Sequence, residues 1–203
     1  MRFTENGKKI ISVLSAAGYK AYFVGGCVRD FFMRRPFNDI DIASSSTPIE
    51  TETALSAAGI RCIETGIKHG TVTAIINGES FEITTFRSDG EYKDNRHPEN
   101  VSFVTDIKTD LARRDFTVNA MAYNENDGLV DVFGGIDDIN NKIIRCVGNP
   151  DKRFNEDALR IIRALRFSSV LGFEIEENTQ KSIFKNKDLL KNIAAERIFV
   201  ELK

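Results

Sequence analysis

The stretch that decides the fold is AYFVGGCVRDFFMRRPFNDIDI, at residues 21–42. Its first four residues, 21–24, are apolar and predict a buried strand, which Gly25-Gly26 ends. A short helix is expected over 28–34. Residues 39–42 alternate polar and apolar side chains, and this pattern predicts a second strand. A strand, a glycine turn, a helix and a strand in this order indicate a mixed α/β domain.

The flanking sequence extends this pattern in both directions. Thr4 can cap a helix that ends at Gly18, and Thr47-Pro48-Ile49-Glu50 is a capping box for a helix that ends at Gly59. Asn77-Gly78 is a strong hairpin signal. The other expected elements are strands at 71–76, 79–86, 101–104, 129–133 and 143–147, a long polar loop at 87–100, a helix at 106–123, and helix throughout from 155 onward. The predicted fold class is α+β, a mixed sheet flanked by helices and followed by an all-helical segment.

Charge divides the 203-residue chain into two parts. Residues 1–141 carry 15 Lys+Arg and 21 Asp+Glu, whereas residues 142–203 carry 13 and 9. This change of sign predicts a domain at 1–141 and a second, helical unit at 142–203. Because the last residues lie inside an expected helix, we expect the helical unit to be truncated here and to continue in a longer natural chain.

Composition excludes several classes. A net charge of −2 excludes a uniformly basic nucleic-acid coat, and two histidines make a His-rich metal site very improbable. The N-terminus lacks the apolar core of a signal peptide, and no apolar run approaches the 18 or so residues of a membrane-spanning helix. Three scattered cysteines fit neither a disulfide framework nor a metal motif. We therefore expect a cytoplasmic protein with no membrane partner.

The first chemical signal is a pair of aspartates. Side chains at i and i+2 of a strand point to the same face, so Asp39 and Asp41 are expected to place two carboxylates side by side. Like charges this close repel unless a cation lies between them. Mg²⁺ commonly binds one or two carboxylates together with substrate phosphates. The pair indicates a divalent-metal site, and two solvated aspartates on an edge strand are the alternative.

The glycine turn is the second signal. In GGCVRD at 25–30, glycines let backbone N–H groups approach a phosphate, and the start of the following helix favours an anion. Arg29 adds a planar guanidinium. A plain tight turn is the alternative. A phosphate-binding turn placed ten residues before a metal-binding pair, counted from Arg29 to Asp39, favours nucleotidyl transfer.

Two later segments carry arginines. The paired arginines of RRDFTVNA at 113–120 can hold a triphosphate or lie at a solvated helix end. In EDALRIIRALRF at 156–167, Asp157 and Arg160 are three apart on an expected helix and are therefore neighbours. The row continues in two further arginines, Arg163 and Arg166. An intrahelical ion pair with a basic solvated face is the alternative.

These four segments resemble three motifs of class II tRNA nucleotidyltransferases. These are the CCA-adding enzymes of the DNA polymerase beta-like nucleotidyltransferase superfamily. The glycine turn and the acidic pair together resemble motif A, RRDFTVNA resembles motif B, and EDALRIIRALRF resembles motif D. DVFGG at 131–135 resembles motif C, and AERI at 195–198 resembles the start of motif E. The resemblance covers essentially the whole chain. It implies a catalytic nucleotidyltransferase head at 1–141 and a neck at 142–203 that selects the nucleobase, without the body and tail helices that grip tRNA.

The resemblance also implies residue roles. Asp39 and Asp41 would be the catalytic residues and would hold two Mg²⁺, while the RNA 3′-hydroxyl attacks the α-phosphorus of the nucleotide. Glu82, on the strand expected at 79–86, is the candidate third carboxylate, and a plain surface role is its alternative. Seven residues would bind the nucleotide: Gly26, Arg29, Arg114, Asp157, Arg160, Arg163 and Arg166.

Base choice follows from hydrogen-bond polarity. Asp157 accepts and Arg160 donates, which matches the Watson–Crick edges of both cytosine and adenine. Uracil and guanine reverse this pattern, and each buried polar group left unpaired costs about 1–3 kcal/mol. With the resemblance, this predicts addition of C and A to the tRNA 3′ end from CTP and ATP, without a nucleic-acid template.

The polar segment at 87–98 resembles the family's flexible loop, which assists the switch from C to A addition. A surface loop is the alternative, and His97 is expected to be a loop residue and not a base. Three other functions stay open: an A-adding enzyme, a bacterial poly(A) polymerase, and a non-catalytic nucleotide-sensing or RNA-interaction module. CTP binding separates C and A addition from the first two. Metal-dependent nucleotide binding that requires Asp41 separates catalysis from the module.

Overall fold

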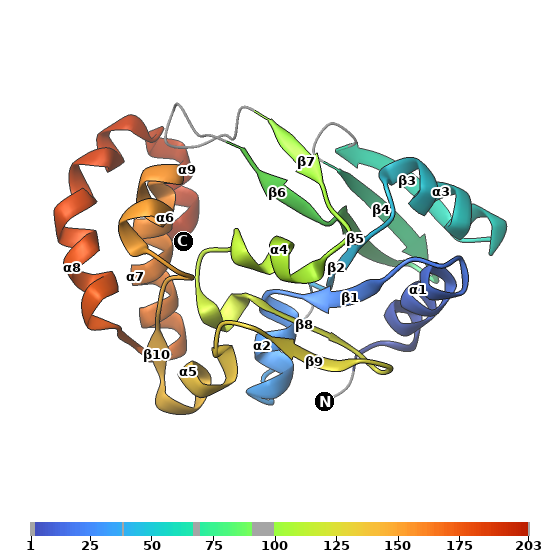
Figure 1. Ribbon diagram of the computed structural model, residues 1–203, viewed down its shortest axis with the longest axis horizontal. Coiled ribbons are helices and arrows are strands. Elements are labelled where there is room, and N and C mark those ends of the chain that lie inside the picture. Colours follow the sequence, from blue (N-terminus) through green and yellow to red (C-terminus); the bar gives the residue numbers. More distant parts are fainter. Residues whose placement is uncertain (1–2, 38, 67–69, 91–99, 203) are drawn as a thin grey trace. The chain divides into compact units, whose positions relative to one another are not determined.

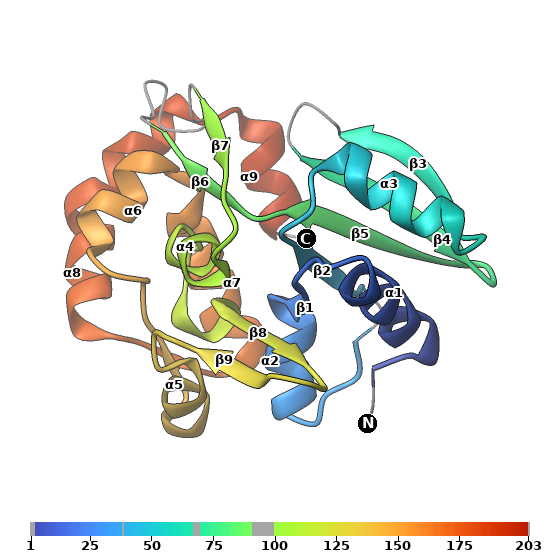
Figure 2. The same ribbon diagram turned by 45° about the vertical axis from the view of Figure 1, so that its right-hand side comes forward.

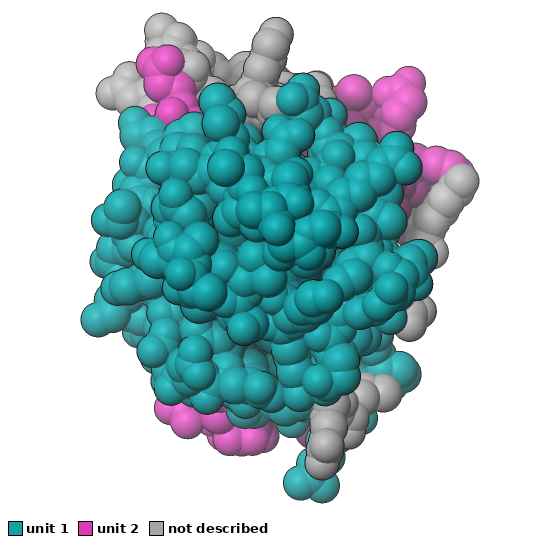
Figure 3. Space-filling view, turned by 90° about the vertical axis from the view of Figure 1, so that its right-hand side faces the viewer, with its two compact units in different colours: residues 1–88, 102–111, 121–132 teal, residues 89–101, 112–120, 133–203 magenta. Residues whose placement is uncertain are grey.

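The computed structural model describes residues 3–37, 39–66, 70–90 and 100–202, which group into two compact units. Figure 3 colours both units on the molecular surface. Unit 1 comprises Met1–Ser88, Ser102–Leu111 and Met121–Val132, and unit 2 comprises Asp89–Val101, Ala112–Ala120 and Phe133–Lys203. Segments from both sides of residue 141 contribute to unit 2. The functional division into a head at 1–141 and a neck at 142–203 stays a prediction.

Unit 1 is built on a seven-stranded sheet with the order β3-β4-β5-β2-β1-β8-β9 (Figure 1). Strands β2 and β5 run parallel and the other neighbours run antiparallel, so the predicted mixed sheet is confirmed. The strands are β1 Ala21–Val24, β2 Asp41–Ser44, β3 Arg61–Gly66, β4 Thr71–Ile76, β5 Glu79–Thr85, β8 Met121–Asn124 and β9 Gly128–Asp131. A separate two-stranded sheet pairs β6 (Arg87–Asp89) with β7 (Val101–Phe103).

Local sequence signals start the helices and the hairpin of unit 1. Thr4 caps α1 (Glu5–Ala16) by accepting the backbone N–H of Gly7. The capping box at Thr47 and Glu50 is complete at the start of α3 (Pro48–Ala57). Asn77 and Gly78 both have positive φ, as the tight turn between β4 and β5 requires. The remaining helices of this part are α2 (Gly26–Phe32) and α4 (Ile107–Ala112).

The sheet register produces one buried row of apolar side chains. Phe23 pairs with Ile42, Ile42 with Ile83, and Ile83 with Val72, across β1, β2, β5 and β4. Each of these four residues exposes 2% of its surface or less. Because side chains alternate along a strand, the next residue of each strand points to the opposite face of the sheet. This alternation places the carboxylates of the candidate site away from the buried row.

Helices α1 and α3 lie side by side on one face of the sheet (Figure 2). Gly7 makes this close approach possible. A Cβ at this position would lie 2.9 Å from Cε1 of Phe23 and 3.1 Å from Cε1 of Phe81. Contacts under about 3.0 Å are sterically excluded, so the glycine allows the helix to sit directly on the aromatic rings.

Unit 2 is mainly helical. Its helices are α5 Gly135–Asn141, α6 Pro150–Glu156, α7 Leu159–Leu171, α8 Glu177–Asn186 and α9 Ala195–Leu202, with short 3₁₀ segments at Thr117–Asn119 and Lys187–Asn192. One core cluster joins Leu159 and Ile162 of α7 to Ile193, with Ile198 of α9 packed against it. The predicted α+β fold class is therefore confirmed. The helical part also contains a parallel pair of β10 (Ile143–Ile144), which lies inside the strand expected at 143–147, and β11 (Glu174–Ile175), which the expectation of uninterrupted helix from 155 onward missed.

The helix expected at 106–123 is wrong beyond α4. The backbone after α4 bonds to a distant segment: Thr117 N–H donates to the carbonyl of Arg145, and Val147 N–H donates to that of Asp115. Residues from Met121 onward then join the sheet as β8. Long-range backbone pairing therefore replaces the helical bonds that the local pattern indicated.

Two further predictions need correction. Strand β2 begins at Asp41, so Asp39 precedes it, because the last pair with β1 is Val24 with Asp41 and Gly25 turns the chain away. The polar loop expected at 87–100 begins as strand β6, and its residues 91–99, including His97, lie outside the described residues. Along the described ranges, no helix has the length and apolar content that crossing a bilayer requires.

Candidate active site

In unit 1, the register aligns two carboxylates on neighbouring strands. Asp41 of β2 lies directly opposite Glu82 of β5 in the parallel pair, and both are exposed. Aligned residues of neighbouring strands share a face and lie about 4.8 Å apart. Asp39 is exposed two residues before Asp41. The sheet therefore brings together Asp41 and Glu82, the candidate third carboxylate. Asp39 lies in the segment that leads directly into β2.

This donor set fits a hard divalent cation in its chemistry. Carboxylate oxygens are the ligands that Mg²⁺ prefers, and the ion commonly takes one or two of them with substrate phosphates completing its shell. Among the described residues, no three His, Cys, Asp or Glu side chains form a group that could hold a metal by itself. This observation fits a metal site in which Asp39 and Asp41 supply the protein ligands and a substrate supplies the rest, better than a site made of protein ligands alone.

The glycine turn precedes this edge in the chain. Gly25, with φ 75°, sits at the N-terminal end of α2, and its N–H donates to the carbonyl of Met121. A Cβ at Gly26 would lie 3.6 Å from Nη2 of Arg29, so the Arg29 guanidinium lies next to the Gly26 backbone. Arg29 is buried, with 9% of the residue exposed, and its guanidinium pairs with Asp30 through two bonds of 3.0 and 2.8 Å. The structure thus brings Gly26 and Arg29 together, with Asp30 holding the arginine.

In unit 2, Asp115 is the buried centre of the RRDF segment. Its carboxylate accepts the Phe116 N–H at 2.8 Å and two bonds from Arg163, at 2.8 and 2.7 Å. Burial alone would raise the pKa of Asp115, but the charge and hydrogen bonding of Arg163, together with the charge of Arg160 and the Phe116 N–H, outweigh burial and lower the pKa. The neighbouring Arg114 is half-buried. This segment is therefore held to α7 by a charged, hydrogen-bonded pair.

The helix expected around Asp157 is interrupted at that residue. Asp157 is the C-cap of α6 in extended conformation, and its Oδ1 accepts the N–H of Leu159 at the start of α7. Arg160 N–H donates to the Asp157 carbonyl at 3.1 Å. The two residues are therefore neighbours through a turn between helices, and not through one continuous helix.

The Arg160 guanidinium is held by several acceptors. It donates to the carbonyls of Arg153 and Arg113, at 3.2 and 3.0 Å, and to Glu156 at 2.8 Å. Glu156 also pairs with Arg153 at 2.9 Å. The role of Glu156 was not predicted, although its i−3 and i+4 spacing to these two arginines is the signal that marks it. The result is a fixed, 8% exposed guanidinium plane at the start of α7.

Arg163 and Arg166 lie one turn apart on α7. Both guanidinium groups lie near the Phe167 ring, at 5.1 and 5.8 Å from its centroid, within the range of cation–π attraction. Both also pair with Glu201 of α9, at 3.2 and 2.8 Å. Within unit 2 the structure therefore places Arg163 between Asp115 and Glu201, and Arg166 beside the same Glu201. Gly26, Arg29, Asp39 and Asp41 belong to unit 1.

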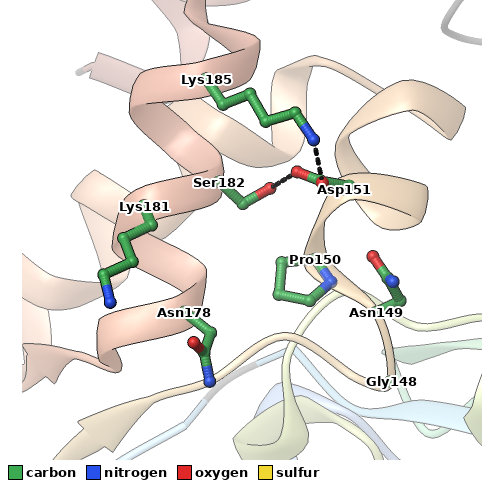
Figure 4. Close-up of a pocket in the computed structure, with 8 residues that line it drawn as sticks. All are labelled: Gly148, Asn149, Pro150, Asp151, Asn178, Lys181, Ser182 and Lys185. Carbon is green, nitrogen blue, oxygen red and sulfur yellow. Dashed lines mark hydrogen bonds and ion pairs between the residues drawn. The ribbon is translucent and has the colours of Figure 1, made fainter.

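A separate groove of about 570 Å³ opens between α6 and α8 (Figure 4). Lys185 and Ser182 both bond to Asp151 there, and with Asn186 they lower the Asp151 pKa to about 2. The other residues lining it are Gly148, Asn149, Pro150, Asn178 and Lys181. None of the predicted site residues lines this groove, so it is distinct from the candidate site.

Comparison with known families then identifies the chain. A model of the poly A polymerase head domain matches residues 21–145, and a model described as the probable RNA and SrmB-binding site of polymerase A matches residues 172–203. The chain belongs to the poly A polymerase head domain family. Together with the CCA-adding relatives described next, this match confirms the resemblance to class II tRNA nucleotidyltransferases that the motifs indicated.

Relatives of this family cover nearly the whole chain. The CCA-adding enzyme of Streptococcus gordonii is 48% identical over 192 residues, which are 95% of this chain and 47% of that protein. A crystal structure of the Bacillus stearothermophilus CCA-adding enzyme in complex with CTP matches with TM-score 0.87 and 43% identity, over 97% of this chain and 46% of that one. The Thermotoga maritima CCA-adding enzyme complexed with tRNA matches at TM-score 0.80 and 27% identity, over 99% and 47%. The chain spans about half the length of these relatives.

Proposed function

We propose that this chain carries the catalytic head of a tRNA nucleotidyltransferase that adds C and A to the tRNA 3′ end from CTP and ATP, without a nucleic-acid template. The observation that carries the proposal is the pair of exposed carboxylates at the start of β2, with Asp41 as its first residue, Asp39 two residues before it and Glu82 aligned with Asp41 on β5. It occurs in a chain that matches the CTP-bound Bacillus stearothermophilus CCA-adding enzyme over 97% of its length. Paired carboxylates and family membership together favour nucleotidyl transfer over a binding module.

Asp39 and Asp41 are the proposed metal ligands and catalytic residues. When bound, Mg²⁺ would lower the pKa of the RNA 3′-hydroxyl and neutralise charge on the triphosphate. The two carboxylates hold the reacting groups at the start of β2. Glu82 is their proposed third partner, through its register with Asp41. Backbone N–H groups at Gly26 and the adjacent Arg29 guanidinium orient the phosphates.

The residues of unit 2 select the base. Asp157 offers an acceptor in the turn between α6 and α7, and Arg160 offers donors from a guanidinium that three acceptors already orient. A guanidinium held in one plane loses little entropy when a base binds, which sharpens discrimination. Cytosine and adenine satisfy this acceptor–donor pair, whereas uracil and guanine oppose it. Arg114, Arg163 and Arg166 are the proposed further contacts to the nucleotide.

A poly(A) polymerase or an A-adding enzyme is the second candidate, because the family model that matches residues 21–145 describes the head domain of poly A polymerase. Either would use ATP without CTP. The identities of 48% and 43% to the CCA-adding enzymes of Streptococcus gordonii and Bacillus stearothermophilus favour the first proposal. The same proposal divides the chain into a catalytic head at 1–141 and a base-selecting neck at 142–203. It also places the protein in the cytoplasm. Three free cysteines support a reducing compartment.

Calorimetric titration with CTP, ATP, UTP and GTP, each with Mg²⁺, tests the proposal. We expect CTP and ATP to bind and UTP and GTP not to bind. D41N should abolish the Mg²⁺-dependent part of binding, while E79Q, an exposed carboxylate on the same strand as Glu82, should leave it unchanged. ATP binding alone would indicate A or poly(A) addition. Equal binding by wild type and D41N would refute the catalytic role of the aspartates.

The proposed RNA partner gives a second test. Residues 142–203 carry a net charge of +4, and phosphate contacts release counterions. We expect the affinity of the chain for the acceptor end of tRNA to fall steadily as salt increases. Affinity that does not change with salt would show that this basic segment does not contact RNA.

A further inference from the structure

Helix α9 brings one carboxylate to the two arginines of α7. Glu201 accepts from Nη1 of Arg163 at 3.2 Å and from Nη1 of Arg166 at 2.8 Å. Its side chain is 12% exposed, although it lies in the last turn of its helix. One acidic side chain therefore links two arginines that are three residues apart.

Packing explains why Glu201 points at α7. Ile198 of α9 packs against the cluster formed by Leu159, Ile162 and Ile193. Residues three apart on a helix share a face, so the face that buries Ile198 also presents Glu201 to α7. The contact thus follows from how α9 docks on its neighbour.

Arg163 is enclosed by acids on both edges. Its Nε and Nη2 groups donate to Asp115, and its Nη1 group donates to Glu201. Burial alone would lower the pKa of Arg163, but Asp115 and Glu201 outweigh burial and raise it. Arg166 differs, because its side chain keeps 44% of its surface exposed and can reach an anion from solvent. Glu201 thereby fixes one edge of an arginine whose other side faces solvent.

We infer that Glu201 is a positioning residue for nucleotide binding, which holds Arg163 and Arg166 in one arrangement beside Phe167. This inference rests on the proposed function, in which both arginines contact the nucleotide. A preoriented guanidinium group loses less conformational freedom when an anionic ligand binds, so the brace raises affinity. The inference also gives α9 a part in nucleotide binding. This helix lies in the segment, residues 172–203, that the RNA-binding family model matches.

The test compares CTP and ATP dissociation constants by calorimetry for wild type, E201Q and E201D. In E201Q an amide NH₂ faces a guanidinium, donor against donor, so one arginine is released. We expect about tenfold weaker binding, the effect of losing one hydrogen bond to a charged group. E201D keeps the charge but is one methylene too short to reach both arginines, so its loss should be intermediate. E174Q, an exposed carboxylate of β11 outside every quoted motif, is the control and should bind like wild type.

A double-mutant cycle separates positioning from a general structural effect. If Glu201 acts through Arg166, the cost of E201Q should shrink in the R166A background, because coupled residues are not additive. An undiminished cost in that background, or binding by E201Q equal to that of E174Q, would overturn the inference. Tighter binding by E201Q would also overturn it, since Glu201 would then compete with the nucleotide for the arginines. Absence of nucleotide binding by wild type would instead refute the proposed function.

Discussion

Replacing Asp115 with asparagine tests the buried pair that holds the RRDF segment to α7. Asparagine keeps the size of the side chain and one oxygen for the Phe116 N–H. Its NH₂ group, however, faces the Arg163 donors that now bond to the carboxylate at 2.8 and 2.7 Å. The substitution therefore removes the charge and both bonds to the guanidinium, and leaves a partly buried cation without this partner.

The expected loss of stability can be worked from the same contacts. Removing one partner of a buried ion pair costs about 3–5 kcal/mol. Arg163 keeps 31% of its side chain exposed and retains Glu201 as a second partner, so the cost falls to the lower end of this range or below it. We expect D115N to lower the free energy of unfolding by about 2–3 kcal/mol. For a chain of this length, that corresponds to a fall in Tm of about 4–12 °C.

The pH dependence gives an independent check. The folded pKa of Asp115 lies below its usual value, so the unfolded chain binds the proton more readily. The stabilisation by the carboxylate is therefore complete above the unfolded pKa and is lost as the pH falls through the folded pKa. The difference between wild type and D115N should stay constant from about pH 8 to pH 5 and shrink below about pH 4.

Urea denaturation followed by circular dichroism, repeated across pH, measures both quantities. D137N, an exposed aspartate of α5, is the matched control and should stay within about 0.5 kcal/mol of wild type. A D115N penalty below about 1 kcal/mol would refute the view that the pair is a strong structural contact. A penalty that persists unchanged at low pH would refute the role of the charge.

Two further substitutions test the packing and capping of unit 1. G7A should lower stability by about 1–2 kcal/mol in thermal unfolding, because its Cβ would lie 2.9 Å from Phe23 and this overpacking exceeds the helix-propensity gain of alanine. S12A, exposed on the same helix, should be neutral or slightly stabilising, and a stabilised G7A would contradict the steric argument. T47A removes the side-chain half of the capping box and should cost about 1 kcal/mol, or a fall in Tm of about 2–4 °C. An unchanged Tm for T47A would show that Glu50 alone supports the start of α3.

Turn and cap chemistry could be predicted because it acts over a few residues. The capping box at Thr47, the N-cap at Thr4 and the Asn77-Gly78 turn all occur where the sequence placed them. The acidic pair and the glycine turn were recognisable for the same reason, since their chemistry lies in adjacent residues. The motif order then predicted the family.

Predictions failed where backbone groups found distant partners. Residues 113–123 carry a helical pattern, yet Thr117 bonds to the carbonyl of Arg145 and the chain from Met121 pairs with β1. Strand β11 was likewise missed, because it exists only through its pairing with β10 some thirty residues earlier. Local propensity is a weak preference, and a set of long-range hydrogen bonds overrides it.

By itself, the sequence determined which residue types could carry the chemistry: Asp39, Asp41 and the arginines of α7. Only the tertiary structure decided which of them meet. The parallel register of β2 and β5 aligned Glu82 with Asp41, and the docking of α9 brought Glu201 to Arg163. These pairings join residues about 40 positions apart in the chain. They depend on sheet register and helix packing, which are set by burial of the whole core and which no local pattern encodes.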